Sequence, residues 1–440
     1  MKNKLKAFFQ GKKVLILGFG REGKSTLELL KDFDCQIGIA DKNLEITDEI
    51  KAYQVFTGEN YLDSMRDYDI IMKSPGVVLL DYPDNATKAK ITSQTDLLLR
   101  FCENKIIGIT GTKGKSTTSS LVYHILDRCG FDTMLIGNIG IPPLQRIDEF
   151  TPETVIVCEM SCHQLEYVKA SPDIAVLLNI YEEHLDHYVN FAAYARAKRN
   201  IYAYQRENDT LIYNTECADD SIASAKFKKI TASSMGCESD IYIDGEIMHI
   251  PYGKIPLSRI KTSLIGKHNL YNIAVALTAA VLAGCDLEQA ISAVESFKGL
   301  EHRLEYVGKI NGVEYINDSI STIPLAAINA LKAFDNVDTL ILGGMDRGIS
   351  YDILVDFLKT YPLKNLILLK DSGYRIGDML GETAFTVYRA KDLTDAVDFA
   401  AKNAVKRCVL SPAAASYGFY KNFEERGKHF KELVGKIKSK

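Results

Sequence analysis

Short runs of apolar residues alternate with amphipathic segments along most of the chain. The runs are continuous, without regular apolar and polar alternation, which is typical of parallel strands buried on both faces of a sheet. They fall at residues 13–17, 36–40, 69–73, 105–110, 132–136, 154–158, 174–178, 312–316, 339–342, 365–369 and 408–410. Helical segments separate many of them, for example residues 121–126. The pattern predicts an α/β protein with doubly wound parallel sheets.

The length of the chain and the grouping of these runs predict more than one domain. At 440 residues the chain is too long for a single core, and a length of roughly 150 residues per domain suggests about three. We expect a Rossmann-like domain at residues 1–98, a central P-loop ATPase-type α/β domain at residues 99–299, and a Rossmann-like C-terminal domain at residues 300–440.

A glycine-rich turn follows the apolar run at 105–110. Glycines at positions 108, 111 and 114 let the backbone approach an anion, so that amide groups and the next helix N-terminus point at it. Lys115 adds a positive charge, and the Ser116 hydroxyl can bind Mg²⁺. The general P-loop spacing would place a glycine where Ile109 stands, but the Gly-Lys-Ser core is intact. These features favour nucleotide binding over a plain strand-to-helix turn with a surface lysine. The turn at residues 108–116 is called the phosphate cradle below.

Polar residues follow the next strands at the same predicted edge of the sheet. Glu159 ends the run at 154–158, where it could hold Mg²⁺ beside the cradle or serve as an ordinary helix-start carboxylate. His184 follows the run at 174–178 and is a candidate second metal ligand. Lys198 lies on the next helix, where a lysine is normally solvated. Together the strand ends predict one shared site.

The first apolar run opens a second nucleotide-binding pattern. Glycines at positions 18, 20 and 23 follow it, and Asp41 ends the next strand about twenty positions on, which matches the dinucleotide fingerprint. The run at 69–73 leads into another tight turn, Ser74-Pro75-Gly76, at the carboxyl end of the same sheet. Such turns hold any diphosphate, including that of a nucleotide sugar, so the fingerprint alone does not select NAD.

Composition excludes several classes of partner. The formal net charge is −4 with both signs interspersed, so nucleic acid and anionic membranes are not expected partners. No apolar run reaches the roughly 18 residues of a membrane span, and the basic N-terminal segment is too weakly apolar for a signal peptide. We therefore expect a cytoplasmic protein without membrane insertion. The nine cysteines are scattered without a Cys-x-x-Cys pair, which predicts reduced and mostly buried thiols.

Motifs that match one known family are spread, in family order, over nearly the whole chain. They lie at residues 110–116, 159–166, 179–186, 268–272, 301–305, 317–319, 411–416 and 421–423. In these motifs the chain resembles the Mur ligase family, and in particular the members that add D-glutamate to UDP-N-acetylmuramoyl-L-alanine. The resemblance implies an ATP-dependent ligase of peptidoglycan precursor synthesis that forms an acyl phosphate, acts as a monomer, and binds the UDP-sugar, ATP and glutamate on successive domains.

The resemblance also implies a role for each motif residue. By this resemblance, ATP is bound by Gly111, Thr112, Lys113, Gly114, Lys115, Ser116, Thr117, Asn272, Arg303 and Asp318. The catalytic set is Lys115, Glu159, His184 and Lys198, and two Mg²⁺ ions fall to Ser116, Glu159, His184 and a carbamylated Lys198. The residues implied to bind the UDP-sugar are Gly20, Arg21, Glu22, Asp41, Ser74, Pro75, Gly76, Asn138, Ser161 and Gln164. Those implied to bind the amino acid are Thr322, Arg347, Ser416 and Phe423.

The chain departs from the family pattern near the predicted amino-acid pocket. Ile320 and Ile323 occupy a segment where the usual D-glutamate ligase has a cation and an amide, so an L-glutamate ligase of the same build is an alternative. A folylpolyglutamate synthase-like ligase shares the cradle but does not account for the N-terminal turns. Two other classes are an NAD-dependent oxidoreductase, which would leave Lys115 and Glu159 without a role, and a nucleotide-binding module that hydrolyses ATP without ligation.

Overall fold

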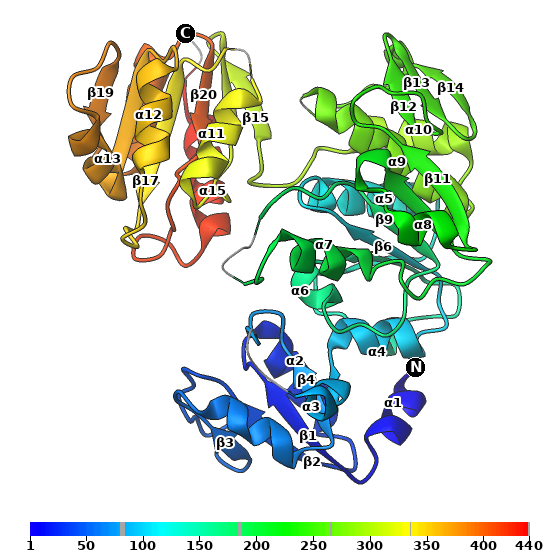
Figure 1. Ribbon diagram of the computed structural model, residues 1–440. Helices are drawn as coiled ribbons and strands as arrows, with labels where there is room; N and C mark the ends of the chain where they lie inside the picture. The colour runs from blue at the N-terminus through cyan, green and yellow to red at the C-terminus, as the bar shows by residue number, and fades with distance from the viewer. Residues whose placement is uncertain (80–83, 184–186, 265, 335, 439–440) are drawn as a thin grey trace. The chain divides into compact units, whose positions relative to one another are not determined.

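Parallel sheets with helices packed against them account for most of the chain (Figure 1). The computed structural model describes residues 1–79, 84–183, 187–264, 266–334 and 336–438. The chain divides into two units, Met1–Lys261 with His268–Phe297, and Thr262–Lys267 with Lys298–Lys440. The predicted α/β class is confirmed, while the domain boundaries expected near residues 98 and 299 stay predictions.

The N-terminal sheet is parallel throughout, with the strand order β3-β2-β1-β4-β5. Its elements are α1 (Lys2–Phe9), β1 (Lys12–Leu17), α2 (Arg21–Leu30), β2 (Cys35–Ala40), β3 (Gln54–Phe56), a 3₁₀ helix (Tyr61–Asp67), β4 (Ile70–Lys73), α3 (Asn85–Ala89), β5 (Ile91–Thr92) and α4 (Gln94–Phe101). The order reverses between β1 and β4. In such sheets ligands bind at the carboxyl ends of the strands that flank this reversal.

The central sheet is also parallel, with the order β11-β10-β9-β6-β8-β7. Its elements are β6 (Ile106–Thr110), α5 (Lys115–Arg128), β7 (Thr133–Gly137), β8 (Val155–Glu159), α6 (Cys162–Leu165), β9 (Ile174–Leu177), α7 (Phe191–Arg199), β10 (Thr210–Asn214), α8 (Asp220–Ser224) and β11 (Lys228–Ala232), with 3₁₀ helices at Ile147–Glu149 and Thr215–Cys217. Because β6 lies between β8 and β9, the carboxyl ends of these strands are neighbours.

A small antiparallel sheet and two helices complete the first unit. The sheet consists of β12 (Tyr242–Asp244), β13 (Ile247–Ile250) and β14 (Gly253–Pro256), and a 3₁₀ helix (Leu257–Arg259) follows it. The helices are α9 (Lys267–Ala283) and α10 (Leu287–Ser296). Asn272 lies on α9, so this late segment returns to the central sheet.

The second unit has one mixed sheet with the order β15-β16-β20-β17-β18-β19. Its elements are β15 (Glu305–Ile310), β16 (Val313–Asn317), α11 (Pro324–Lys332), β17 (Thr339–Gly344), α12 (Asp352–Thr360), β18 (Asn365–Asp371), α13 (Ser372–Leu380), β19 (Thr386–Arg389), α14 (Leu393–Asn403), β20 (Arg407–Leu410) and α15 (Phe423–Gly435). Only the pairing of β15 with β16 is antiparallel among these strands.

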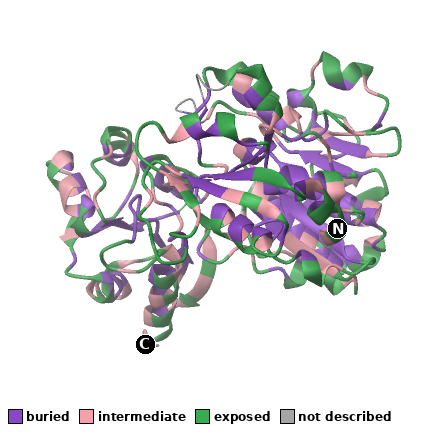
Figure 2. Ribbon diagram, turned by 90° about the horizontal axis from the view of Figure 1, so that it is seen from below, coloured by how far each residue is buried: buried purple, intermediate pink, exposed green. Residues whose placement is uncertain are grey.

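Successive residues of β17 show why its apolar run is continuous. Leu340 and Leu342 belong to the core that α11, α12 and α13 cover, whereas Ile341 belongs to the core that α14 and α15 cover on the other face. Both faces of the strand are therefore buried, as the continuous runs predict. The strands are mainly purple in Figure 2, while exposed residues lie mostly on helices and loops.

The apolar runs predicted the buried strands, and each predicted run contains a strand in the structure. Most strands that the pattern missed are short or half-exposed: β3, β5, β11, β12, β13, β14, β15 and β19. The pattern also missed β10, which is mostly buried and lies between β9 and β11. Several are sheet-edge strands, which need fewer apolar residues because one side faces water. The pattern therefore identifies sheet centres better than sheet edges.

The cysteine prediction needs one correction. A disulfide joins Cys129, at the end of α5, to Cys285, between α9 and α10, so the prediction of reduced thiols is wrong at these two positions. The free cysteines in the described structure are Cys35, Cys102, Cys158, Cys162, Cys217, Cys237 and Cys408, and most of them are fully or partly buried. The two bridged residues are 156 positions apart, a separation at which spacing alone gives no pairing signal.

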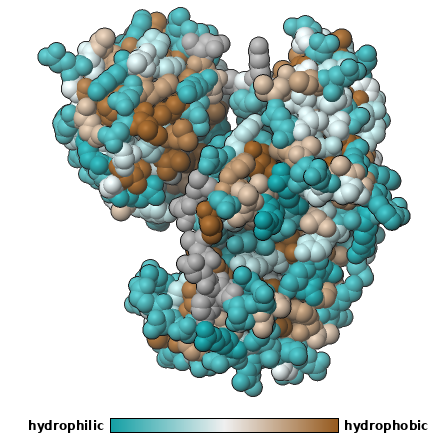
Figure 3. Space-filling view, in the orientation of Figure 1, coloured by the Kyte–Doolittle hydropathy of each residue, from teal (hydrophilic) through white to brown (hydrophobic). Residues whose placement is uncertain are grey.

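Most of the visible surface is hydrophilic, with one concentration of apolar residues on the second unit (Figure 3). On α11 and α12, or just before them, Ile323, Leu325 and Ile353 are 48%, 47% and 56% exposed. These side chains lie outside the core of the unit. No helix in the described part of the chain has both the length and the apolar character of a membrane span.

Candidate active site

The predicted phosphate cradle forms the turn between β6 and α5. Gly111 and Gly114 have φ values of 157° and 85°, which other residues rarely adopt. A Cβ atom on Gly114 would lie only 2.8 Å from Oδ1 of Asn272. The turn therefore needs glycine and packs against Asn272, a residue predicted for the nucleotide. Ser116 and Thr117 lie in the first turn of α5, where free amides favour an anion.

Asn179, directly after the β9 end of the sheet, holds the cradle in shape. Its backbone carbonyl accepts a hydrogen bond from the Thr112 amide at 2.9 Å, and its Oδ1 accepts one from the Lys113 amide at 2.7 Å. Its Nδ2 donates to the Lys113 carbonyl at 3.0 Å. The side chain of Lys113 forms an ion pair with Glu183 at 2.7 Å. Asn179 thus fixes the loop through contacts that do not involve Lys115, and sequence reasoning gave Asn179 no such role.

Two lysine ammonium groups converge on one carbonyl of the cradle. Nζ of Lys115 and Nζ of Lys198 each donate to the Gly111 oxygen at 2.9 Å. Lys198 is only 1% exposed, so the alternative of a solvated surface lysine on α7 is wrong. Burial and then the nearby charge of Lys115 lower the pKa of Lys198 to about 8, although Glu183 and Glu159 oppose the shift. The arrangement places a lysine of unusual proton affinity beside the predicted phosphates.

Glu159 ends β8 next to the cradle and is fully buried. Nδ2 of Asn138 donates to its Oε1 at 2.6 Å, and Oγ of Ser119 donates to its Oε2 at 3.3 Å. Asn138, predicted for the UDP-sugar, is therefore held by the predicted metal ligand. Sequence reasoning gave no role to Ser119, which lies on the same helix as Ser116.

The described residues can be tested against the predicted Mg²⁺ site. His184 lies outside the described residues. Within the described ranges, no three His, Cys, Asp or Glu side chains are grouped as a metal site would require. The Ser116 hydroxyl and the Glu159 carboxylate are nevertheless the kind of oxygen ligand that Mg²⁺ prefers, and a carboxylate with one hydrogen bond on each oxygen still has lone pairs for a cation. The donor set therefore fits Mg²⁺.

The predicted UDP-sugar residues lie at the carboxyl ends of β1 and β4. Oγ of Ser74 donates to the Gly18 carbonyl at 2.8 Å and so links the two turns; Pro75 and Gly76 follow it. Oδ2 of Asp41 accepts the Phe19 amide at 2.7 Å, which fixes the first turn. Gly20 precedes α2 as its N-cap residue. The structure brings these residues together, but it uses Asp41 to hold the turn.

The remaining UDP-sugar candidates connect the first sheet to the central one. Arg21 donates to the Gly140 carbonyl. Ser161 caps α6 and forms a capping box with Gln164. Nε2 of Gln164 also donates to Oε1 of Glu22 at 2.9 Å, and burial raises the pKa of Glu22. Helix α6 is thus tied to the N-terminal turns by a side-chain hydrogen bond.

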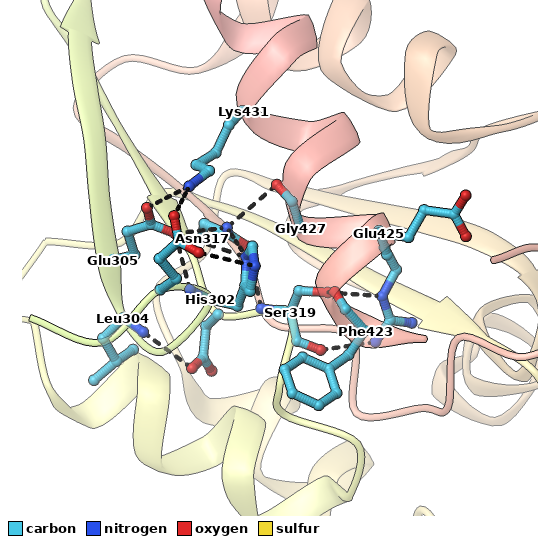
Figure 4. Close-up of polar contacts among 12 residues, drawn as sticks. His302, Leu304, Glu305, Asn317, Ser319, Phe423, Glu425, Gly427 and Lys431 are labelled. Carbon is cyan, nitrogen blue, oxygen red and sulfur yellow. Dashed lines mark hydrogen bonds and ion pairs between the residues drawn. The ribbon is translucent and has the colours of Figure 1, made fainter. Parts of the chain in front are cut away.

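In the second unit, a polar cluster holds the turn that carries Arg303 (Figure 4). Nδ2 of Asn317 lies 2.9 Å from Nδ1 of His302 and donates to Glu305 at 2.9 Å, and Lys431 forms an ion pair with Glu305 at 2.8 Å. His302 adopts a φ of 64°, which is uncommon for a residue with a side chain. These contacts fix the conformation on both sides of Arg303, which sequence reasoning did not foresee.

Asp318 follows β16 directly and is almost fully buried. Its carboxylate accepts hydrogen bonds from Ser321 at 2.5 Å, Ser411 at 2.8 Å and the Leu304 amide at 3.2 Å. Burial nevertheless raises the pKa of Asp318 to about 6, and these hydrogen bonds and the charge of Arg303 oppose the shift. Asp318 is therefore bonded to the backbone of the residue that directly follows Arg303.

The raised pKa of Asp318 predicts a pH-dependent stability. Between the ordinary pKa and about 6 the folded carboxyl keeps a proton that the unfolded chain loses, so its contribution to stability falls as the pH rises. An Asp318→Asn substitution removes this slope. The difference in the free energy of unfolding, variant minus unmodified protein, should therefore increase by up to about 3 kcal/mol from pH 4 to pH 7. Denaturant unfolding at the two pH values measures this, and an equal difference at both would contradict it.

The predicted amino-acid residues also lie in the second unit. Nη2 of Arg347 donates to the Thr322 carbonyl at 3.0 Å. Ser416 is buried, and the carbonyl of Phe423 accepts a hydrogen bond from Ser319 at 2.8 Å. Sequence reasoning missed Arg426, which is 1% exposed.

The Arg426 guanidinium donates to backbone carbonyls of Ser319, Ala414 and Ala415, and burial lowers its pKa to about 10. A positive charge is thereby buried beneath the segments that carry Ser319 and Ser416. The only sequence signal was the inward position of Arg426 on α15, where Phe430 is also buried.

Comparison with known proteins gives the same assignment along the whole chain. The Mur ligase middle domain matches residues 109–280. Proteins of Clostridium kluyveri and Clostridioides difficile, both named UDP-N-acetylmuramoylalanine–D-glutamate ligase, are each 34% identical to this chain over 98% of its length and over 98% and 99% of their own.

Solved structures show the same fold at lower identity. A MurF ligase from Thermotoga maritima in complex with ADP matches with a TM-score of 0.56 at 18% identity, covering 98% of this chain and 97% of that one. The UDP-N-acetylmuramate-alanine ligase MurC from Thermotoga maritima matches with a TM-score of 0.58 at 17% identity, covering 97% and 100%. With full-length relatives at this identity and the middle-domain match over its cradle, the chain belongs to the Mur ligase family of ATP-dependent amide-bond-forming ligases.

Proposed function

We propose that this protein joins D-glutamate to UDP-N-acetylmuramoyl-L-alanine with ATP, as a step of peptidoglycan precursor synthesis. The names of the full-length relatives support this substrate pair. The structural observation that carries the proposal is the convergence of Lys115 and Lys198 on the Gly111 carbonyl, beside the buried Glu159. This arrangement suits transfer of a phosphoryl group between two anions, because positive charge and metal-binding oxygens meet at the transfer point.

The proposed reaction has two steps. An oxygen of the alanine carboxylate attacks the γ-phosphorus of ATP, the bond to the β-phosphate oxygen breaks, and an acyl phosphate and ADP form. The glutamate amine then attacks the acyl carbon, the carbon–oxygen bond to phosphate breaks, and the amide, inorganic phosphate and a proton are released. The first step meets strong repulsion between carboxylate and polyphosphate, which Lys115 and the amides at the start of α5 reduce.

Mg²⁺ would supply charge neutralisation at the phosphates, and Mur ligases generally use it. We propose that Ser116 and Glu159 hold one ion and that His184, which is outside the described residues, takes part in holding a second. Gly111, Thr112, Lys113, Gly114, Thr117, Asn272, Arg303 and Asp318 complete the proposed ATP set. Ser119 and Asn138, which donate hydrogen bonds to Glu159, orient its carboxylate for binding the metal ion.

We also propose that Lys198 is carbamylated. A neutral amine is needed to attack CO₂, giving an N-carboxylate and a proton, and the lowered pKa of Lys198 increases the fraction of that neutral amine. The modification would replace the repulsion between Lys198 and Lys115 by attraction. It would also add an anionic oxygen ligand close to Glu159.

The other substrates fall to the two Rossmann-like sheets in this proposal. The UDP-sugar set consists of Gly20, Arg21, Glu22, Asp41, Ser74, Pro75, Gly76, Asn138, Ser161 and Gln164. Glutamate occupies the region of Thr322, Arg347, Ser416 and Phe423, where the Arg347 guanidinium can bind a carboxylate with two hydrogen bonds. We further propose that the enzyme is a monomer. We place it in the cytoplasm, because a nucleotide sugar and ATP are both cytoplasmic substrates.

Release of ADP with each glutamate enantiomer tests the proposed function. With ATP, Mg²⁺ and UDP-N-acetylmuramoyl-L-alanine, we expect fast ADP release with D-glutamate and little with the L-enantiomer. Preference for L-glutamate would support the alternative suggested by Ile320 and Ile323. No stimulation by either enantiomer would overturn the ligase assignment to this substrate pair.

A further inference from the structure

Lys73 is a buried charged residue that the proposed reaction does not use. It ends β4 and is 4% exposed. Its neighbour Ser74 donates to the Gly18 carbonyl, so Lys73 directly precedes a residue that joins the two proposed diphosphate turns. A buried ammonium is retained only where it has partners, because a charged group loses its favourable interaction with water on burial. The partners of Lys73 therefore indicate what it does.

These partners belong to the segment that follows the central strand β8. Nζ of Lys73 lies 3.4 Å from Oε2 of Glu166 and 5.6 Å from the centre of the Tyr167 ring. Nε2 of His187 lies 3.6 Å from the same Glu166 oxygen. Burial acts to raise the pKa of Glu166, but His187 and Lys73 hold it below its usual value. Glu166 is thus a charged partner, and Lys73 links the N-terminal sheet to it.

Helix α6 is held by the N-terminal sheet through two side-chain contacts. At its third residue, Gln164 donates to Glu22 at 2.9 Å, and just past its end Glu166 pairs with Lys73 at 3.4 Å. The helix starts after Ser161, two positions beyond Glu159. Helix α6 therefore connects residues of the N-terminal sheet to the strand end that carries the predicted metal ligand Glu159.

The charges in this region also require Lys73. Glu22 and Glu166 are two carboxylates close to the turns proposed for a diphosphate, and burial raises the pKa of Glu22. Both carboxylates act on Lys73, because each opposes the lowering of its pKa by burial. Without this cation, Glu22 and Glu166 would lose a positive charge that acts on both of them beside an anionic substrate.

We infer that Lys73 is a positioning residue of the UDP-sugar site, which holds α6 against the diphosphate turns and offsets the charge of Glu22 and Glu166. The inference rests on the proposed function for the identity of the substrate. Lys73 does not contact the reacting atoms in this account. It fixes the positions of Ser161 and Gln164 for binding of the UDP-sugar.

A Lys73→Met substitution tests the inference. We expect the KM for UDP-N-acetylmuramoyl-L-alanine to rise at least about tenfold, while the KM values for ATP and glutamate change by less than about twofold. Lys73→Arg, which keeps the charge, should recover most of the affinity. Because a lone buried carboxylate can impair folding, the double variant Lys73→Met/Glu166→Gln removes both charges of the pair and should fold with the same KM defect.

Lys169 offers a matched control. Its Nζ donates to the carbonyls of Ala89 and Ile91 at 3.0 and 2.9 Å, so it also links the segment after α6 to the N-terminal part of the chain, but through neither Glu22 nor Glu166. Lys169→Met should leave all three KM values near those of the unmodified enzyme. An unchanged KM for the UDP-sugar in the folded Lys73 variants, or equal changes for all substrates, would overturn the inference.

Calorimetric titration with UDP separates this inference from the proposed function. If the unmodified protein releases no ADP with the proposed substrates, the function fails, but UDP binding can still be compared. A weaker UDP affinity in Lys73→Met than in Lys169→Met would support the inference. Equal UDP affinity in the two variants would overturn it.

Discussion

Replacing Lys198 with alanine should reduce kcat at least about a thousandfold while the protein stays folded. The side chain is buried and donates to the same carbonyl as Lys115, so the Gly111 oxygen keeps a hydrogen-bond partner when Lys198 is removed. Activity is lost in this account because the proposed carbamate, and with it an anionic ligand beside Glu159, is absent. Steady-state ADP release measures the loss, and thermal unfolding measures the fold.

Chemical rescue distinguishes this role from a structural one. Short carboxylic acids such as acetate should partly restore Lys198→Ala, because they can occupy the vacated space and supply the missing oxygens. Lys198→Arg keeps a cation that cannot form a carbamate and should stay inactive. Arg196→Ala, at an exposed position of the same helix, is the matched control and should be fully active. Normal turnover by Lys198→Ala in both ordinary and CO₂-depleted buffer would contradict the proposal.

Replacing Lys115 with alanine should lower kcat at least about a hundredfold, which corresponds to roughly 3 kcal/mol of barrier. Lys115 is the first residue of α5, and its ammonium lies at the carbonyls of Gly111 and Thr112, beside the helix start where the transferring phosphoryl group is expected. The cradle should keep its shape, because Asn179 holds the amides of Thr112 and Lys113 independently of Lys115. The defect should therefore appear in the chemical step, which single-turnover ADP formation measures.

The matched control for Lys115 lies at the other end of the same helix. Arg128 is the last residue of α5 and is exposed, so Arg128→Ala removes a positive charge from α5 without touching the cradle. We expect it to retain normal kcat. A Lys115→Ala enzyme that keeps most of its kcat would show that the phosphoryl group is transferred elsewhere.

Sequence patterning predicted the sheet centres and the cradle because their causes are local. A strand buried on both faces needs a continuous apolar run, and a turn that approaches phosphate needs glycine, as Gly111 and Gly114 show. The burial of Lys198 was foreseeable in part, because Tyr194 precedes it by one helical turn on the same face and is itself buried. The family membership decides against the NAD-dependent oxidoreductase, which the N-terminal fingerprint alone left open.

Other features depend on partners that are distant in sequence. Asn179 meets Lys113 across 66 positions, and Arg426 meets Ser319 across 107. Lys73 reads as the plain end of a strand until the structure places it beside Glu166. Such contacts arise from how the sheets assemble, and no local rule on propensity or spacing contains that information.

Isotope transfer from the substrate carboxylate tests the central claim most directly. UDP-N-acetylmuramoyl-L-alanine labelled with ¹⁸O in both oxygens of its terminal carboxylate is incubated with ATP, Mg²⁺, D-glutamate and the enzyme, and the phosphate is analysed by mass spectrometry. Attack of the carboxylate on the γ-phosphorus followed by amine attack on carbon carries one labelled oxygen into inorganic phosphate at each turnover. We expect singly labelled phosphate in equal amount to the amide product; unlabelled phosphate, or label in AMP, would contradict the proposed reaction.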